Sequence, residues 1–185
     1  MAENADLELS FVERVLGGSV VLSASLLAGA HVFQALGYAP CDLCLDQREA
    51  HWTALGVSFA GLAAALVFKA RRAAAAAIGA AALVYAVSAG LAFYHTGVEF
   101  KFWPGPPTCT SGGVVELGEG GLAGALEKGP SGPSCEDAPW RFLGISMAGY
   151  NFLFSAGLFA LCLSAAVTAN RVAVKRSPTE LTAEF

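Results

Sequence analysis

The stretch Pro40-Cys41-Asp42-Leu43-Cys44-Leu45-Asp46-Gln47-Arg48 sets two cysteines three residues apart, where a long apolar segment begins. Proline is accepted in the first turn of a helix, so the stretch predicts a helix that begins at the cysteines. Residues at steps of three and four positions share one face of a helix. That face would carry Cys41, Cys44, Arg48 and His51.

This helix start favours redox chemistry at the cysteine pair. Free N–H groups and the positive end of the helix dipole lower the pKa of a thiol placed there. Arg48 follows Cys44 by four residues and keeps its charge at any working pH, so it would stabilise a thiolate or an anionic partner. We therefore expect Cys41 and Cys44 to open and reclose as a disulfide.

The composition indicates a membrane protein. Of 185 residues, 55% are hydrophobic and only 14% are charged, which is too apolar for a soluble domain of this length. A helix needs about 20 apolar residues to cross a bilayer. Four segments qualify, at about 15–33, 44–68, 73–94 and 145–167. The first is expected to stay as a membrane helix rather than act as a cleaved signal, because acidic residues precede it.

We therefore predict an all-α membrane protein, a single domain over 1–185 built as a bundle of four transmembrane helices. Basic residues gather in two places, which should be cytoplasmic. They are Lys69, Arg71 and Arg72 after the second segment, and Arg171, Lys175 and Arg176 after the fourth. Both termini then lie inside, with tails 1–10 and 175–185 expected to be disordered. Loops 34–43 and 97–141 lie outside, and residues 122–128 are expected to form a short interfacial helix.

Four of the five cysteines fall in the two outer loops, where disulfides persist. Cys109 and Cys135 follow prolines, which favour extended chain. Cys162 lies in the last apolar segment and is expected to contribute only packing. His95 ends the third segment at the depth of the cysteine pair, as a candidate site group or a solvated histidine. His31, near the outer end of the first segment, is equally consistent with a site group or an interfacial histidine.

Two separated cysteine pairs are consistent with structural disulfides, a zinc site or a relay that exchanges disulfides. Zinc is disfavoured, and no metal site is expected, because a second closely spaced pair is missing. A conduit carrying electrons outward is disfavoured because no cysteine pair lies on the cytoplasmic side. A relay needs a final electron acceptor, and the sequence has no nicotinamide, flavin, haem or iron–sulfur fingerprint. A lipid-soluble quinone is the acceptor that could reach the inner pair.

The order and spacing of these features resemble the DsbB family of bacterial inner-membrane disulfide bond formation proteins. The resemblance runs from the first apolar segment through the fourth. It is carried by Pro40-Cys41-Asp42-Leu43-Cys44, Arg48, Tyr94-His95, Cys109, Cys135 and Trp140-Arg141-Phe142-Leu143-Gly144.

The resemblance implies a thiol:quinone oxidoreductase that reoxidises a DsbA-like periplasmic thiol oxidase and reduces ubiquinone or menaquinone. It implies that the partner attacks Cys109 and that Cys135 exchanges with Cys41. Cys44 would then face the quinone, with Arg48 and His95 beside the ring.

Some alternatives stay open beside this reading. A family variant dedicated to one specialised thiol partner would use the same residues. A non-catalytic membrane protein with two structural disulfides is a rival from another class. His51 is not carried over from the family, and it is expected to be a solvated or packed histidine.

Overall fold

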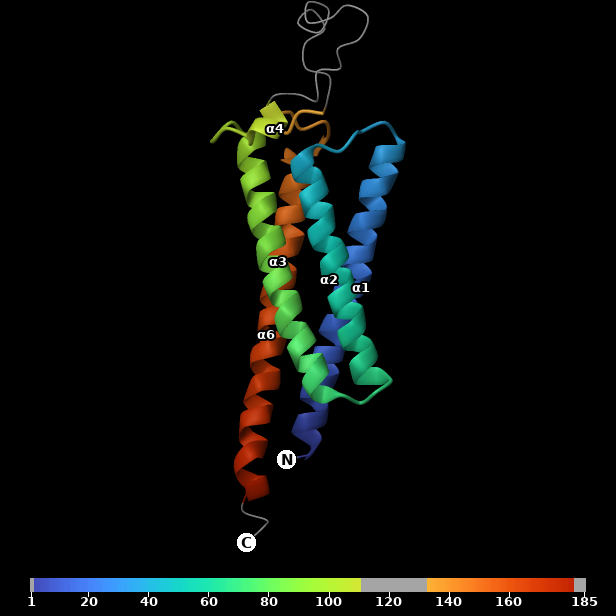
Figure 1. Ribbon diagram of the computed structural model, residues 1–185, viewed down its shortest axis with the longest axis vertical. Helices are drawn as coiled ribbons and strands as arrows, with labels where there is room; N and C mark the ends of the chain where they lie inside the picture. Colours follow the sequence, from blue (N-terminus) through green and yellow to red (C-terminus); the bar gives the residue numbers. More distant parts are fainter. Residues whose placement is uncertain (1, 111–132, 182–185) are drawn as a thin grey trace, which may run out of the picture.

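The computed structural model describes residues 2–110 and 133–181 and consists mainly of four long helices (Figure 1). These are α1 (Ala2–Ala35), α2 (Asp42–Leu66), α3 (Arg71–Glu99) and α6 (Met147–Leu181). A single turn, α4 (Pro107–Thr110), and two short strands, β1 (Arg141–Phe142) and β2 (Ile145–Ser146), lie at the end of the bundle where α2 begins. The first residue of α1 and the last of α6 lie at the opposite end.

Short connections make consecutive helices antiparallel neighbours. Only 67–70 separate α2 from α3, and Lys69 turns the chain there with a φ of 52°. Gly61 lies where α2 meets α3, and a Cβ on it would collide with the side chain of Ala77. The missing side chain therefore lets the two backbones approach closely, as small residues do in membrane bundles.

Two apolar clusters hold the bundle. The larger one lies between the helices and includes the fully buried Leu16, Ile78 and Tyr85. The smaller one lies at the loop end and consists of Cys41, Leu43, Val98, Cys109 and Cys135, with Cys44 and Trp103 packed against it. Four cysteines thus meet in or against one apolar cluster at the start of α2.

Three of the described helices are long and apolar enough to cross a membrane: Ser10–Ala35, Arg71–Glu99 and Met147–Arg171. Large apolar side chains point outward along them, such as Val21 (67% exposed) and Leu83 (70%). Because such surface is unfavourable in water, it indicates contact with lipid. The fourth long helix, α2, exists as expected, but its first two turns carry Asp42, Asp46, Arg48 and Glu49. Its crossing of the membrane stays a prediction.

A β-hairpin precedes α6 and was not predicted. Arg141 pairs with Ser146, and Phe142 pairs with Ile145 in antiparallel register. The two turn residues, Leu143 and Gly144, have φ values of 50° and 80°. Positive φ at both central positions gives the tight turn whose twist fits a hairpin. The hairpin directs the chain from the outer loop into α6.

The helices extend further than the sequence analysis predicted. Residues 2–10 and 175–181 were expected to be disordered, but α1 begins at Ala2 and α6 continues to Leu181. Adding a residue to an existing helix costs little, so polar helix formers prolong apolar helices beyond their membrane portion. Cys109 also lies on the helical turn α4 rather than on extended chain, because Pro107 occupies the first position of that turn. The expected interfacial helix at 122–128 falls outside the described residues.

Candidate active site

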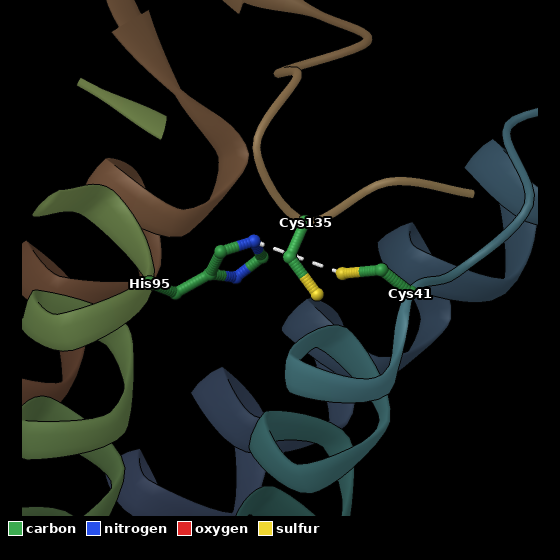
Figure 2. Close-up of side chains that lie close together, drawn as sticks. All are labelled: Cys41, His95 and Cys135. Atoms are coloured by element: carbon green, nitrogen blue, oxygen red, sulfur yellow. Dashed lines mark hydrogen bonds between the residues drawn. The ribbon is translucent and has the colours of Figure 1, made fainter. Parts of the chain in front are cut away.

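The candidate site lies at the loop end of the bundle, where three distant segments meet. Cys41 caps α2, His95 is in the last turns of α3, and Cys135 lies between the outer loop and the hairpin. Figure 2 shows their side chains facing one another. The two sulfurs and a ring nitrogen of His95 all lie within 4.8 Å of one another, and Cys41 Sγ is 3.7 Å from His95 Nε2.

The two cysteine pairs are in different redox states. Cys109 and Cys135 form a disulfide, whereas Cys41 and Cys44 are free thiols with their sulfurs 2.7 Å apart. All of these cysteines except Cys44 are buried, with Cys109 3% and Cys135 0% exposed. A thiol pair with one buried and one half-buried member therefore lies directly against a buried disulfide.

The state of Cys41 is set by its neighbour. The hydrogen-bonding contact with the Cys44 sulfur raises the pKa of the Cys41 thiol, and burial raises it further. Two sulfurs this close share one proton between them, because two adjacent thiolates would repel. Cys41 is the member of the pair that holds this proton.

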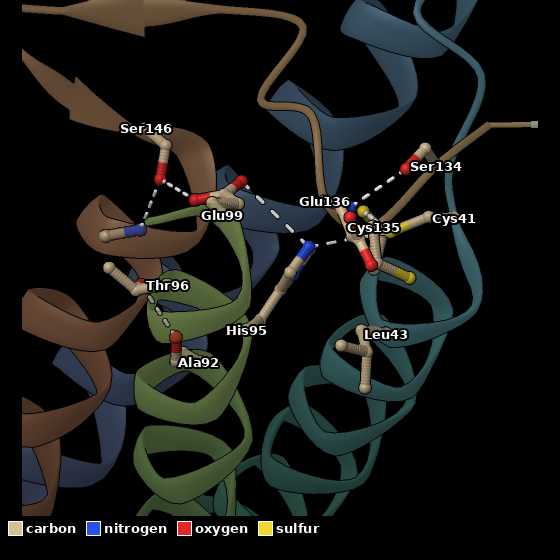
Figure 3. A network of polar contacts seen from close by, with 12 residues as sticks. Cys41, Leu43, Ala92, His95, Thr96, Glu99, Ser134, Cys135, Glu136 and Ser146 are labelled. Carbon is tan, nitrogen blue, oxygen red and sulfur yellow. Dashed lines mark hydrogen bonds and ion pairs between the residues drawn. The ribbon is translucent and has the colours of Figure 1, made fainter. Parts of the chain in front are cut away.

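A buried polar network continues from His95 along α3. Figure 3 shows Glu99, one turn after His95, between the imidazole and Ser146. Glu99 Oε1 lies 3.9 Å from His95 Nε2, and the Ser146 hydroxyl donates a hydrogen bond to Glu99 Oε2. The side chain of Glu99 is only 4% exposed. A carboxyl buried this deeply needs such partners, because an isolated charge in an apolar environment is very unfavourable.

Arg48 is held by α1 rather than by the cysteines. Its guanidinium donates to Gln34 Oε1 at 2.6 Å and to the backbone carbonyl of Ala30 at 3.1 Å. These bonds fix the cation in the lining of a cavity that Cys44 also lines. Arg48 and Cys44 thus line the same cavity, and the role of Arg48 toward a thiolate stays a prediction.

The cavity beside the cysteines has a volume of about 670 Å³. The surface of its lining is mostly apolar, and polar side chains such as Gln47 and Asn151 also take part in it. Residues on its wall include Phe33, Tyr38, Cys44, Arg48, His95 and Met147. Pockets of this size and character bind small organic molecules and cofactors.

The match to a known family covers most of the chain. A family model described as "Disulfide bond formation protein DsbB" matches residues 13–165. The chain belongs to the DsbB family. Comparisons with curated proteins and with solved structures each gave no match. Family membership and the apolar helices together indicate a multi-pass membrane protein with a disulfide oxidoreductase role.

The structure also shows the surroundings of three further residues of this DsbB-family protein that the sequence analysis discussed. His51 is packed, as expected: it is 4% exposed, and its ring bonds to Ser23 and Asn151 while it lines the cavity. His31 is exposed and lies outside the cavity lining. Cys162 is fully buried, 3.5 Å from the Ser19 hydroxyl, far along α6 from the site.

The cluster of Cys41, His95 and Cys135 has the donor types of a metal site. A cysteine binds zinc as a thiolate, and the Cys135 sulfur is bonded to Cys109 instead. In this redox state, the DsbB-family site therefore has disulfide chemistry available to it rather than metal ligation.

Sequence reasoning missed three polar residues of the site. Glu99 was assigned to the outer loop, although its spacing of four from His95 would have placed both on one helix face. Gln47 lies within the cysteine stretch and contacts His95. Asn151, a polar residue inside an apolar segment, contacts both Gln47 and His51. A polar side chain in a membrane helix is itself a signal of function or of a buried partner.

Proposed function

We propose that this protein is a thiol:quinone oxidoreductase that reoxidises a DsbA-like periplasmic thiol oxidase and passes the electrons to ubiquinone or menaquinone. One observation carries the proposal. The disulfide Cys109–Cys135 presents Cys135 to the Cys41 sulfur within 4.8 Å, so the two pairs are in position for exchange.

The exchange follows ordinary thiol–disulfide chemistry. A thiolate of the reduced partner attacks Cys109 and releases Cys135, and the partner's second thiol then frees Cys109 as the partner becomes oxidised. Cys135 next attacks Cys41 in a Cys41–Cys44 disulfide and releases Cys44 as a thiolate. Cys109 resolves the resulting bond by attacking Cys135, which returns the outer disulfide and leaves Cys41 reduced. Two electrons move inward, and each bond that breaks is matched by one that forms.

The bonding of the cysteines in the structure is compatible with this direction of transfer. The outer pair is oxidised and the inner pair is reduced. This is the state that the relay reaches once electrons have passed to Cys41 and Cys44 and before they leave. In this state the helix start favours a thiolate at Cys44, which lines the cavity.

The cavity fits a quinone head group. Its apolar walls suit the ring and the start of a prenyl tail, while Arg48 and His95 supply polar hydrogens at the end near Cys44. A quinone bound there would accept two electrons and two protons. Arg48 would bind the side of the cavity where negative charge develops, in a site where surrounding apolar groups strengthen electrostatic attraction. His95 would contact the Cys41 sulfur, and Glu99 beside it would hold a mobile proton.

The site also has a consistent place in the membrane. The basic residues at 69–72 lie at the end of the bundle that holds the start of α1 and the end of α6, opposite the cysteine site. Positive residues favour the cytoplasmic side. We therefore propose a bacterial inner-membrane location with both termini cytoplasmic and the cysteine loops periplasmic.

Quinone reduction by the full chain in detergent tests the proposal. The protein receives a reduced DsbA-like partner and ubiquinone-1 or a short-chain menaquinone, and quinol is followed by absorbance. We expect rapid quinol formation that disappears in Cys44→Ser and slows in Arg48→Ala. Cys162→Ala is the matched control and should retain the full rate, because this cysteine packs far from the site.

The rival reading predicts a different result. A membrane protein with purely structural disulfides would form no quinol with any partner or quinone. Neither of its cysteine pairs would change its redox state during the assay. A family variant with one specialised partner would form quinol with that thiol protein and fail with a general DsbA-like oxidase.

A further inference from the structure

A chain of side-chain hydrogen bonds runs from the candidate site into the middle of the bundle. It links α3 to α2, α6 and α1 through Gln47, Asn151 and the two buried histidines. The bonds are Gln47 Nε2 with His95 Nδ1 (2.8 Å), Asn151 Nδ2 with Gln47 Oε1 (2.6 Å), His51 Nε2 with Asn151 Oδ1 (2.7 Å) and Ser23 Oγ with His51 Nδ1 (3.2 Å).

One contact fixes which groups donate and which accept along these hydrogen bonds. The Gln47 side-chain nitrogen also donates to the backbone carbonyl of Leu43 at 2.9 Å. A backbone carbonyl can only accept, so the atom facing it must be the NH₂ group. If the amide were reversed, two oxygens would face each other at Leu43. The orientation of Gln47 therefore follows from a group whose role is not ambiguous.

Every other role in the chain follows from that orientation. The second N–H of Gln47 points at His95 Nδ1, so this nitrogen accepts and the proton of the neutral ring is on Nε2. Gln47 Oε1 accepts from Asn151, which leaves the Asn151 oxygen facing His51 Nε2. His51 is then also protonated on Nε2, and its Nδ1 accepts from Ser23.

We propose that Gln47 is a positioning residue that holds His95 as a fixed donor, with the Nε2 hydrogen directed at the Cys41 sulfur. His95 Nε2 lies 3.7 Å from Cys41 Sγ and 3.9 Å from Glu99 Oε1, and the ring also makes a hydrogen bond with the backbone of Cys135. A ring nitrogen that already carries hydrogen stabilises a thiolate but does not take the thiol's proton. A further proton on Nδ1 would face the Gln47 N–H. Toward the sulfur His95 therefore acts as a donor and not as a base, and Glu99 is the adjacent group whose carboxylate oxygen can accept a proton.

The tautomers can be measured directly, because the chain has only three histidines. The full-length protein is labelled with ¹⁵N-histidine in detergent, and the ring signals are assigned with His31→Gln and His51→Gln. We expect hydrogen on Nε2 and a bare Nδ1 for both His51 and His95. A wild-type His95 with hydrogen on Nδ1 overturns the proposal, and this result needs no variant to fold.

Two variants separate the roles of the links. Gln47→Glu replaces the donor to Nδ1 by an acceptor, so His95 should gain hydrogen on Nδ1. Asn151→Leu removes the bonds of Asn151 to Gln47 and His51 but leaves the bond from Gln47 to Leu43. His95 should therefore keep the wild-type position of its ring hydrogen, while the ring signals of His51 should change. An unchanged His95 signal in Gln47→Glu would contradict the positioning role. Asn170→Asp, an exposed amide change at the other end of α6, is the control and should alter neither ring.

The consequence for turnover rests on the proposed function. Gln47→Glu should slow quinol formation about 10-fold and shift its pH profile, as loss of a residue that orients a reactive group commonly does. An unchanged rate and pH profile would show that the tautomer does not matter for transfer. If the wild type forms no quinol, the proposed function fails, while the ¹⁵N measurement still decides the tautomer.

Discussion

The sulfur of Cys135 lies within 4.8 Å of the sulfur of Cys41, although one belongs to the disulfide of the outer loop and the other caps α2. Exchange between the pairs should therefore need little movement. In Cys44→Ala, the Cys41 thiol has no neighbouring thiol, so its thiolate should attack Cys135 and release Cys109. Mass spectrometry of unreduced peptides should find a Cys41–Cys135 bond in part of the molecules.

Two controls accompany this trapping experiment. Cys162→Ala should show only the Cys109–Cys135 bond that the wild type has. The double variant Cys41→Ser/Cys44→Ala should show no bond between the loops. If Cys44→Ala keeps its outer disulfide in every molecule at alkaline pH, the two sulfurs do not exchange.

The contact with Cys44 should control the pH dependence of Cys41. A raised pKa leaves less Cys41 thiolate at any given pH, so alkylation should be slow near neutrality and rise at alkaline pH. Cys44→Ala removes the largest cause of the raised pKa, and the alkylation profile of Cys41 should move to lower pH. Peptide mass spectrometry after timed exposure to iodoacetamide gives the rates. A profile that stays in place, or moves to higher pH, would contradict this assignment.

The anchoring of Arg48 by α1 should matter for quinone affinity. Gln34→Leu removes the acceptor 2.6 Å from the guanidinium, which frees the cation to leave the cavity wall. Loss of a hydrogen bond to a charged group corresponds to about 1.5–3 kcal/mol, so KM for the quinone should rise at least about 10-fold. Steady-state kinetics with a saturating reduced partner measure this. Arg72→Ala, an exposed cation at the other end, should leave KM unchanged, and an unchanged KM in Gln34→Leu would argue against the anchor.

Ser146 should be important for stability through two bonds. Its hydroxyl donates to Glu99 and also accepts the N–H of Gly149, as an N-cap of α6. Ser146→Ala removes the cap and leaves a buried carboxyl oxygen without its donor, which should lower the free energy of unfolding by about 2 kcal/mol. Thermal unfolding in detergent provides the comparison. Ser146→Thr keeps a hydroxyl and should unfold close to the wild type. If Ser146→Ala unfolded at the same temperature as the wild type, the stabilising role of Ser146 would be refuted.

Gly97 and Gly90 form a matched pair within α3. A Cβ at Gly97 would overlap the ring of Trp103, which stacks on Tyr94 and donates to its backbone carbonyl. Gly97→Ala should displace this tryptophan at a cost of about 1–3 kcal/mol. Nothing lies within 4 Å of a Cβ at Gly90, so Gly90→Ala should be neutral or slightly stabilising. Tryptophan fluorescence and thermal unfolding measure the two effects. Equal fluorescence and equal unfolding temperatures of the two variants would contradict this prediction.

The number of helices and the place of the thiol pair could be predicted because both depend on local sequence. Apolar runs indicate membrane helices wherever they occur, and Pro40 marks a helix start in any protein. Helix ends were predicted less well, since the free energy of adding one more turn at Ala2 or Leu181 is small. The hairpin was missed because Leu143, a non-glycine residue, adopts a positive φ there.

The polar part of the site could be predicted only in pieces. Cys41, Cys44 and Arg48 share one helix, so their spacing was enough. The contact between Gln47 and Asn151 depends on the rotation of α6 against α2, which no local pattern contains. For the same reason, sequence spacing could not show that Gln34 on α1 anchors Arg48.

The burial of the outer disulfide has a consequence for turnover. Cys109 is 3% exposed and Cys135 is fully buried, so a partner protein cannot reach either sulfur in this conformation. The arrangement that favours exchange with Cys41 therefore excludes the partner. In the proposed relay, receiving electrons from a partner would require the cysteine segments to lift away, and delivering them to Cys41 would require the segments to return. The outer disulfide of the proposed relay could thus react with the partner or with Cys41, but not with both in one conformation.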